Sequence, residues 1–153
     1  MNKFYKFLVI YLLIIGCGYQ PIFSEKKVNF GIKDLVYDKN KKVDLSINKN
    51  LRNYRSLENK NIALDLEILS ETKKITTSLD DRGDPKSFRL EIEVSAIVKD
   101  DNNETYQKKF NKSQDYNNNT NKFDLTKYEN SIKENLINKI TEEIIVFILS
   151  LEI

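Results

Sequence analysis

Few side chains in this sequence could carry out catalysis or bind a metal. The 153 residues include one cysteine, Cys17, and no histidine. Catalytic triads and dyads that need histidine are therefore excluded. The common zinc and iron sites, which use cysteine and histidine ligands, are excluded as well. What remains for chemistry is a set of carboxylates, a set of basic side chains and the Cys17 thiol.

Glu91 and Glu93 form a carboxylate pair that general acid–base catalysis could use. Residues two apart on a strand share one face, so this pair is expected at the surface. Nothing in the surrounding sequence indicates a pocket that would raise the pKa of either carboxyl group. We therefore predict that the protein is not an enzyme and has no cofactor.

Cys17 follows a segment with the features of a secretory signal. Lys3 and Lys6 precede an apolar run over residues 7–15, and a small glycine, Gly16, comes directly before the cysteine. The run is too short to cross a bilayer, because a spanning helix needs about 20 apolar residues. This order of charged, apolar and small residues favours a signal peptide over a buried N-terminal strand with a free thiol.

Residues 14–17, Ile-Ile-Gly-Cys, resemble the bacterial lipobox. In that pattern the cysteine thiol is diacylated, the signal is cut before the cysteine, and the new amino terminus is usually acylated too. Two or three acyl chains hold a protein stably on a membrane, whereas one does not. The motif predicts a signal peptide over residues 1–16, lipid attachment at Cys17 and a lipidated tether over residues 17–27.

The mature chain has no net charge. The full sequence contains 25 Lys and Arg against 23 Asp and Glu, and removal of Lys3 and Lys6 with the signal leaves 23 against 23. Nucleic-acid binding would require a basic surplus, so we expect no nucleic-acid partner. The length of the mature chain suits one domain, which we place at residues 28–153.

Hydrophobic periodicity in this domain changes along the chain. A period of two, typical of strands with one buried face, recurs in four segments. A period of three to four residues, typical of helices, occurs in two. Residues 70–72 predict a kink in the second strand, and "DDRGDPK" predicts a turn. The expected elements are a short strand in residues 28–37, a helix over 43–54, strands over 62–79, 88–98 and 105–116, and a long helix over 125–149.

The start of the long helix carries two competing capping signals. Thr126 and Glu129 have the spacing of a capping box, and Asp124 is an alternative cap. The overall order is βαβββα. It predicts an α+β fold, a two-layer sandwich in which two helices cover one face of a mainly antiparallel four-stranded sheet. The other sheet face would then be open to a ligand or partner.

The start of the mature chain, Cys-Gly-Tyr-Gln-Pro-Ile-Phe at residues 17–23, resembles the lipopolysaccharide-assembly lipoprotein LptE family, especially its alphaproteobacterial forms. The similarity in element order and spacing extends over nearly all of the mature chain. It implies a protein anchored in the outer membrane and facing the periplasm and a barrel lumen. There it would act as plug and assembly partner of the LptD barrel in lipopolysaccharide transport. A lipid-anchored pilot or accessory subunit of another envelope or secretion complex is the alternative.

Lipopolysaccharide carries phosphates and other acids, so the resemblance implies contacts with basic side chains at strand ends and in loops. Arg82 and Lys86 flank the predicted turn, Arg89 lies on the predicted open face, and Lys108 belongs to the return strand. These four are the expected contacts. The alternative is that they are ordinary solvated side chains balanced by neighbouring acids.

Overall fold

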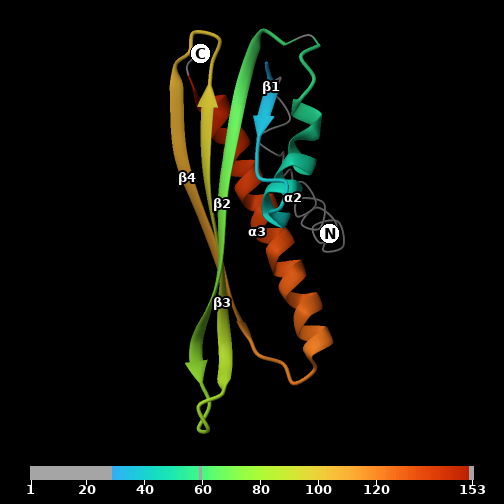
Figure 1. Ribbon diagram of the computed structural model, residues 1–153, viewed down its shortest axis with the longest axis vertical. Coiled ribbons are helices and arrows are strands. Elements are labelled where there is room, and N and C mark those ends of the chain that lie inside the picture. The colour runs from blue at the N-terminus through green and yellow to red at the C-terminus, as the bar shows by residue number, and fades with distance from the viewer. Residues whose placement is uncertain (1–28, 59, 152–153) are drawn as a thin grey trace, which may run out of the picture.

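The computed structural model describes residues 29–58 and 60–151 (Figure 1). The predicted signal peptide, Cys17 and the tether lie outside these residues. No helix within them is both long enough and apolar enough to cross a membrane. The elements are strand β1 (Phe30–Val36), helix α2 (Lys42–Asn50), 3₁₀ helix η1 (Leu51–Tyr54), strands β2 (Ile62–Leu79), β3 (Pro85–Lys99) and β4 (Thr105–Asn117), and helix α3 (Lys122–Ser150).

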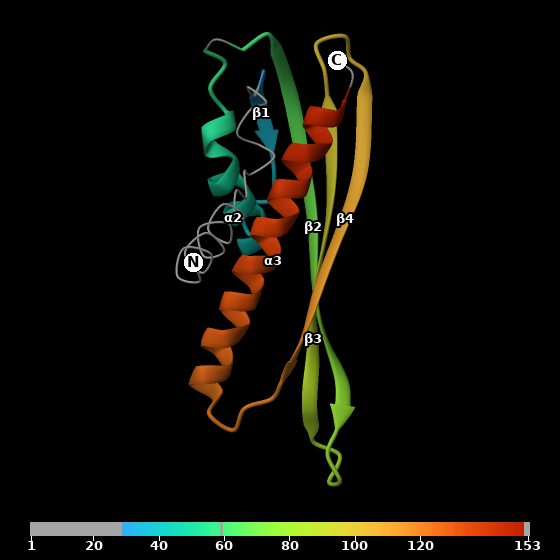
Figure 2. The ribbon, with the colours of Figure 1, turned by 180° about the vertical axis from the view of Figure 1, so that it is seen from behind.

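The strands form one sheet in the order β1-β2-β3-β4. Strand β1 pairs with β2 in parallel, through residues 62–67 of β2, whereas β2–β3 and β3–β4 are antiparallel. Both helices pack on the same face, α3 against β3 and β4 and α2 against α3 and β2 (Figure 2). The predicted α+β fold with the order βαβββα is confirmed.

Side-chain alternation explains why the helices cover this face. The even-numbered residues Leu90, Ile92, Val94, Ala96 and Val98 of β3 are all buried, with at most 5% of their surface exposed. They point to the helix-covered face, whereas odd-numbered neighbours such as Arg89 and Glu91 point to the other, open face. Buried residues of α3 at helical spacing complete the core: Leu125, Ile132, Leu136, Ile137, Ile140, Ile144 and Ile148.

The predicted kink at residues 70–72 is wrong, because β2 continues without a break from Ile62 to Leu79. Polar residues can continue the strand here because β3 pairs with it throughout this stretch. Ser70 is buried on the helix-covered face, and its carbonyl oxygen accepts a hydrogen bond from Lys41 Nζ at 2.6 Å. The irregularities in pairing come later, between Thr76 and Leu79.

The predicted start of α3 is also wrong. The helix begins at Lys122, and the Asn121 side chain caps it by accepting hydrogen bonds from the backbone N–H groups of Phe123 and Asp124. Thr126 lies inside the helix and donates to the Lys122 carbonyl. The capping-box interpretation missed Asn121 because several asparagines in the preceding loop offer equivalent caps.

The β2–β3 hairpin extends beyond the core. Strand β1 lies beside only one half of β2, and residues 71–79 of β2 are exposed on both faces (Figure 1). We call the turn Asp80–Asp84 and its surroundings the hairpin end of the molecule. The loop between β4 and α3 lies at this end too, because Ser87 pairs with Asn117.

Candidate functional site

The main cavity at the hairpin end is a groove of about 510 Å³, between the β2–β3 turn and the loop that leads into α3. We call it the hairpin groove. Two of the four expected contacts, Arg82 and Lys86, line it, and Lys122 adds a third cation from the start of α3. The other lining residues are Asp80, Asp84, Pro85, Phe88, Asn118 and Thr120.

The turn that forms one wall is held by Asp80. Its carboxylate accepts hydrogen bonds from the backbone N–H groups of Arg82 and Asp84, both at 2.9 Å. The bond from the Asp84 N–H, followed by that from Arg82, lowers the pKa of Asp80. Gly83 has φ +85°, a left-handed conformation that glycine adopts without a steric cost. These hydrogen bonds hold the turn in one conformation, with the Arg82 side chain 83% exposed at its tip.

Asn118 ties the second wall to the first. Its backbone N–H donates to the Lys86 carbonyl at 2.9 Å and its side-chain amide to the Pro85 carbonyl at 2.7 Å. Lys122 Nζ is 3.3 Å from Asn118 Oδ1. The Lys86 ammonium group has no hydrogen-bond or ion-pair partner among the described residues, so it is available to a ligand. Cations from both walls therefore line the groove.

An aromatic cluster lies behind the groove. Phe88 packs on Tyr116, with ring centroids 5.6 Å apart, and Lys74 Nζ lies 4.1 Å from the Phe88 centroid. Glu129 Oε1 accepts from both Lys74 Nζ (2.6 Å) and the Tyr116 hydroxyl (2.8 Å). Burial raises the pKa of Glu129, but these two bonds together with the positive charges of Lys74 and Lys133 outweigh it, and the net shift is downward. Burial, followed by the bond to Glu129, raises the pKa of Tyr116.

Arg89 lies on the open face, as predicted, but it is already engaged. Its guanidinium donates to the Asp115 carboxylate at 2.6 and 3.0 Å. It lies in a ladder of polar pairs across β3 and β4. Asn111 donates to Glu91 at 2.6 Å, Lys109 lies 3.5 Å from Glu93, and Gln107 donates to Ser95 at 3.0 Å. The two carboxylates considered for catalysis are therefore part of this ladder.

Lys108 lies apart from the other three expected contacts. It pairs in register with Ala96, seven residues along β3 from Arg89, which is about 23 Å at 3.3 Å per residue. Its side chain belongs to the helix-covered side, with Nζ 5.5 Å from the centroids of both Phe110 and Phe147. The structure brings Arg82 and Lys86 together and does not bring Lys108 to them.

Sequence reasoning missed Lys122, Phe88 and Asn118 as neighbours of Arg82. The signal for them was present in the predicted hairpin of strands 88–98 and 105–116. Antiparallel pairing brings the residues after the return strand next to those before its partner. Register alone therefore places the "NNNTN" loop beside Lys86.

The hairpin groove suits an anionic ligand with an apolar part. Arg82, Lys86 and Lys122 offer donors to phosphate or carboxylate groups, and Phe88 offers an aromatic surface. Within residues 29–58 and 60–151, no group of three or more His, Cys, Asp or Glu side chains could hold a metal ion. The groove is a surface hollow lined by exposed charges beside a hydrogen-bonded turn.

We compared the sequence and the fold with those of known proteins. No protein-family model matches the sequence. No curated protein matches it. Several solved structures have the same fold, and three of them are bacterial lipoproteins. Rare lipoprotein B from Shewanella oneidensis is 20% identical, with a TM-score of 0.57 over 79% of this chain and 93% of that one.

The other two are more distant in sequence. A minor lipoprotein from Acinetobacter baumannii is 14% identical, with a TM-score of 0.53 over 76% of this chain and 86% of that one. The solution structure of an uncharacterized lipoprotein B from Nitrosomonas europaea is 12% identical, with a TM-score of 0.51 over 78% and 84%. At these identities the similarity is one of fold.

Proposed function

We propose that this protein is an outer-membrane lipoprotein, anchored through Cys17, that acts as plug and assembly partner of an LptD-type barrel in lipopolysaccharide transport. The lipobox-like sequence before Cys17 and the LptE-like start of the mature chain support this proposal. The fold supports it further, because three proteins that share it are bacterial lipoproteins.

The open sheet face is the observation that carries the plug hypothesis. On β3 and β4 it presents acids, bases and amides, several of them paired across the strands, while the fully buried apolar side chains of these strands lie under the helices. A barrel lumen is polar and hydrated. A protein that fills it needs a dry core of its own and an exterior of mixed charge, which is what this two-layer arrangement provides.

Lipopolysaccharide contact is proposed at the hairpin end. Arg82 and Lys86 line the groove there. Arg89 lies three residues after Lys86 in β3, on the open face. Lys108, seven residues along the sheet, would have to meet a different part of the ligand. Lys122 joins the proposed contacts because it lines the same groove.

Crosslinking in cells tests the function directly. A photoreactive amino acid at Ser113, exposed on the open face, should capture a large barrel that co-purifies with the protein. The same probe at Glu142, exposed on α3, shows whether the helices also meet the partner. Capture of a secretin-type ring or of peptidoglycan would instead support a pilot or accessory subunit of another envelope complex. Depletion should lower the amount of assembled barrel and of surface lipopolysaccharide.

A further inference from the structure

One edge of the sheet remains open beyond the end of β1. Strand β1 pairs only with residues 62–67 of β2, so the same side of β2 has no strand beside it from Ile68 to Leu79 within the described residues (Figure 1). Residues 71–79 are exposed, and several are β-branched. Such an edge offers unpaired backbone groups to another strand.

The direction of these backbone groups follows from two contacts. The Ile62 N–H donates to the Asn29 carbonyl at 3.3 Å, and the Ser70 carbonyl accepts from Lys41 Nζ at 2.6 Å. Both groups therefore point away from β3. Backbone direction alternates along a strand, and the pairing with β3 is regular as far as Thr76. Thr72, Lys74 and Thr76 thus direct their N–H and C=O groups outward as well.

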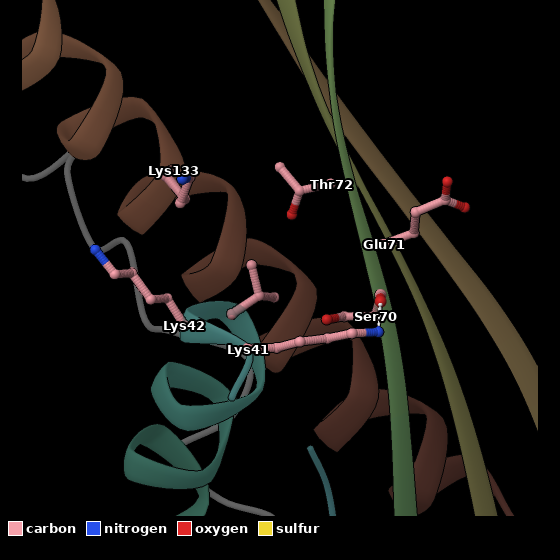
Figure 3. A pocket seen from close by; sticks show the side chains of 7 residues that line it. Lys41, Lys42, Ser70, Glu71, Thr72 and Lys133 are labelled. Atoms are coloured by element: carbon pink, nitrogen blue, oxygen red, sulfur yellow. Dashed lines mark hydrogen bonds between the residues drawn. The ribbon is translucent and has the colours of Figure 1, made fainter. Parts of the chain in front are cut away.

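A basic pocket of about 350 Å³ lies beside the start of this edge. Its lining includes Lys133 of α3 and Ser70 and Thr72 of β2. Lys41, just before α2, extends across to β2, whereas the side chain of Lys42, the first residue of α2, points away from β2 (Figure 3). The Glu71 carboxylate points to the other side of the strand. Lys42 has no hydrogen-bond or ion-pair partner among the described residues, and Lys133 has only a longer-range interaction with Glu129. The pocket therefore favours a carboxylate.

We propose that this edge of β2 binds an extended acidic peptide segment of another protein as an added strand. The backbone of the peptide pairs with Thr72, Lys74 and Thr76, and a Glu or Asp side chain near one end contacts Lys42 and Lys133. Main-chain bonds give affinity in this mode of recognition, and side-chain pockets give specificity. The bond from Lys41 to Ser70 closes the edge on the β1 side, so it sets where the added strand begins.

This inference needs no barrel and no lipopolysaccharide, so its test is independent of the proposed function. The probe is an end-blocked seven-residue peptide of alternating valine and glutamate, added to the full-length chain in detergent. Amide hydrogen exchange should slow at Thr72, Lys74 and Thr76 while the amides bonded to β3 remain unchanged. N-methylation of one peptide amide on the pairing side should weaken binding by about tenfold, as expected for roughly one lost hydrogen bond.

Charge reversal provides a second measurement that leaves the strand intact. Lys42→Glu with Lys133→Glu should abolish the preference for this peptide over one with lysine in place of glutamate. Lys139→Glu, exposed on the same helix α3, is the matched control and should leave the preference unchanged. The proposal is overturned if the N-methylated peptide binds equally well, if protection appears elsewhere, or if no binding occurs. It is also overturned if the three amides become protected on raising protein concentration alone, because the edge then pairs with a second copy.

Discussion

The Arg89 guanidinium and the Asp115 carboxylate form a two-pronged ion pair across β3 and β4, with Nε–Oδ1 at 2.6 Å and Nη2–Oδ2 at 3.0 Å. The two residues face each other in the register of the sheet. Their side chains are 46% and 57% exposed, so solvent screens the attraction and its contribution to stability is small. The pair orders the open face near the hairpin end more than it stabilises the fold.

This pair predicts a pH dependence. The hydrogen bond from Arg89 lowers the pKa of Asp115 below its usual 3.8, although slight desolvation acts in the opposite direction. A lowered folded-state pKa stabilises the protein above about pH 4 and stops doing so as pH falls through the folded-state value. Asp115→Asn should therefore unfold at a slightly lower urea concentration than the parent at neutral pH, and the difference should vanish near pH 2.

The control for that measurement is Asp101→Asn, an exposed residue in the turn between β3 and β4. The difference in unfolding urea concentration between this variant and the parent should not change between neutral pH and about pH 2. A gap between Asp115→Asn and the parent that stays constant down to strong acid would contradict the role assigned to the ion pair.

Ile92 and Glu93 test the assignment of the two sheet faces. Ile92 is 0% exposed, so Ile92→Ala should lower the free energy of unfolding by roughly 2–5 kcal/mol, the usual cost of such a cavity. Glu93→Ala, one residue along on the open face, should cost less than about 1 kcal/mol, because it removes only an exposed pair with Lys109. Urea unfolding measures both. Equal costs would mean that the register of β3 is misassigned.

Two glycines should respond to alanine for different reasons. At Gly31 an added Cβ would lie 2.7 Å from both Leu57 Cδ2 and the Ser56 carbonyl oxygen. Gly31→Ala should therefore cost about 1–3 kcal/mol through overpacking. At Gly83 nothing lies within 4 Å, and only the φ of +85° opposes a side chain. Gly83→Ala should cost about 1–2 kcal/mol, and Gly83→Asn should recover part of it. Thermal unfolding of the three variants distinguishes crowding from backbone strain.

Charge reversal in the hairpin groove tests the proposed lipopolysaccharide contact. Arg82→Glu, Lys86→Glu and Lys122→Glu together should weaken binding to the purified glycolipid by about tenfold or more, with an unchanged circular dichroism spectrum. Added salt should weaken binding by the parent, because exposed charges are screened beyond about 8 Å at physiological ionic strength. Lys139→Glu, exposed on α3 and not part of the groove lining, is the control. A triple variant that binds as well as the parent would remove the groove from the proposal.

The anchor can be tested at a single atom. Cys17→Ser removes the thiol that the lipobox-like sequence would have acylated, so incorporation of a fatty-acid analogue should be lost. The variant should also leave the membrane fraction or remain uncleaved. A signal-retaining control, Tyr19→Phe, keeps the cysteine and should label normally. Unchanged labelling of Cys17→Ser would rule out lipidation at this residue.

Period-two alternation predicted β3 well because one face of this strand is fully buried, as Leu90, Ile92 and Val94 show. In β2 the extent of the strand was predicted correctly, but the kink expected at residues 70–72 is wrong. There the strand leaves the core and is exposed on both faces, so no alternation remains to be detected. The pairing with β3, a tertiary contact, keeps it extended.

The candidate site was predicted in part for a related reason. Arg82 and Lys86 were placed together because they flank one turn in sequence. Lys108 was grouped with them by charge, although its distance and its face depend on the register between β3 and β4. Lys122 was missed because it joins the groove through the pairing of β3 with β4 and through Asn118, and that pairing was predicted but not followed past the end of the return strand. The shared turn was enough to group Arg82 with Lys86, whereas Lys122 required the register of the sheet.

Helix α3 follows all four strands in the sequence, yet it covers the apolar face of β3 and β4. During synthesis and export the sheet would therefore be complete before its cover arrives. The contact between α2 and α3 also forms late, because it needs α3. There the Asn50 side-chain amide donates to Asn138 Oδ1 at 2.9 Å, across 88 residues of sequence. A premature stop before Lys122 would leave Ile92, Val94 and Phe110 uncovered, and such a product should aggregate or be degraded.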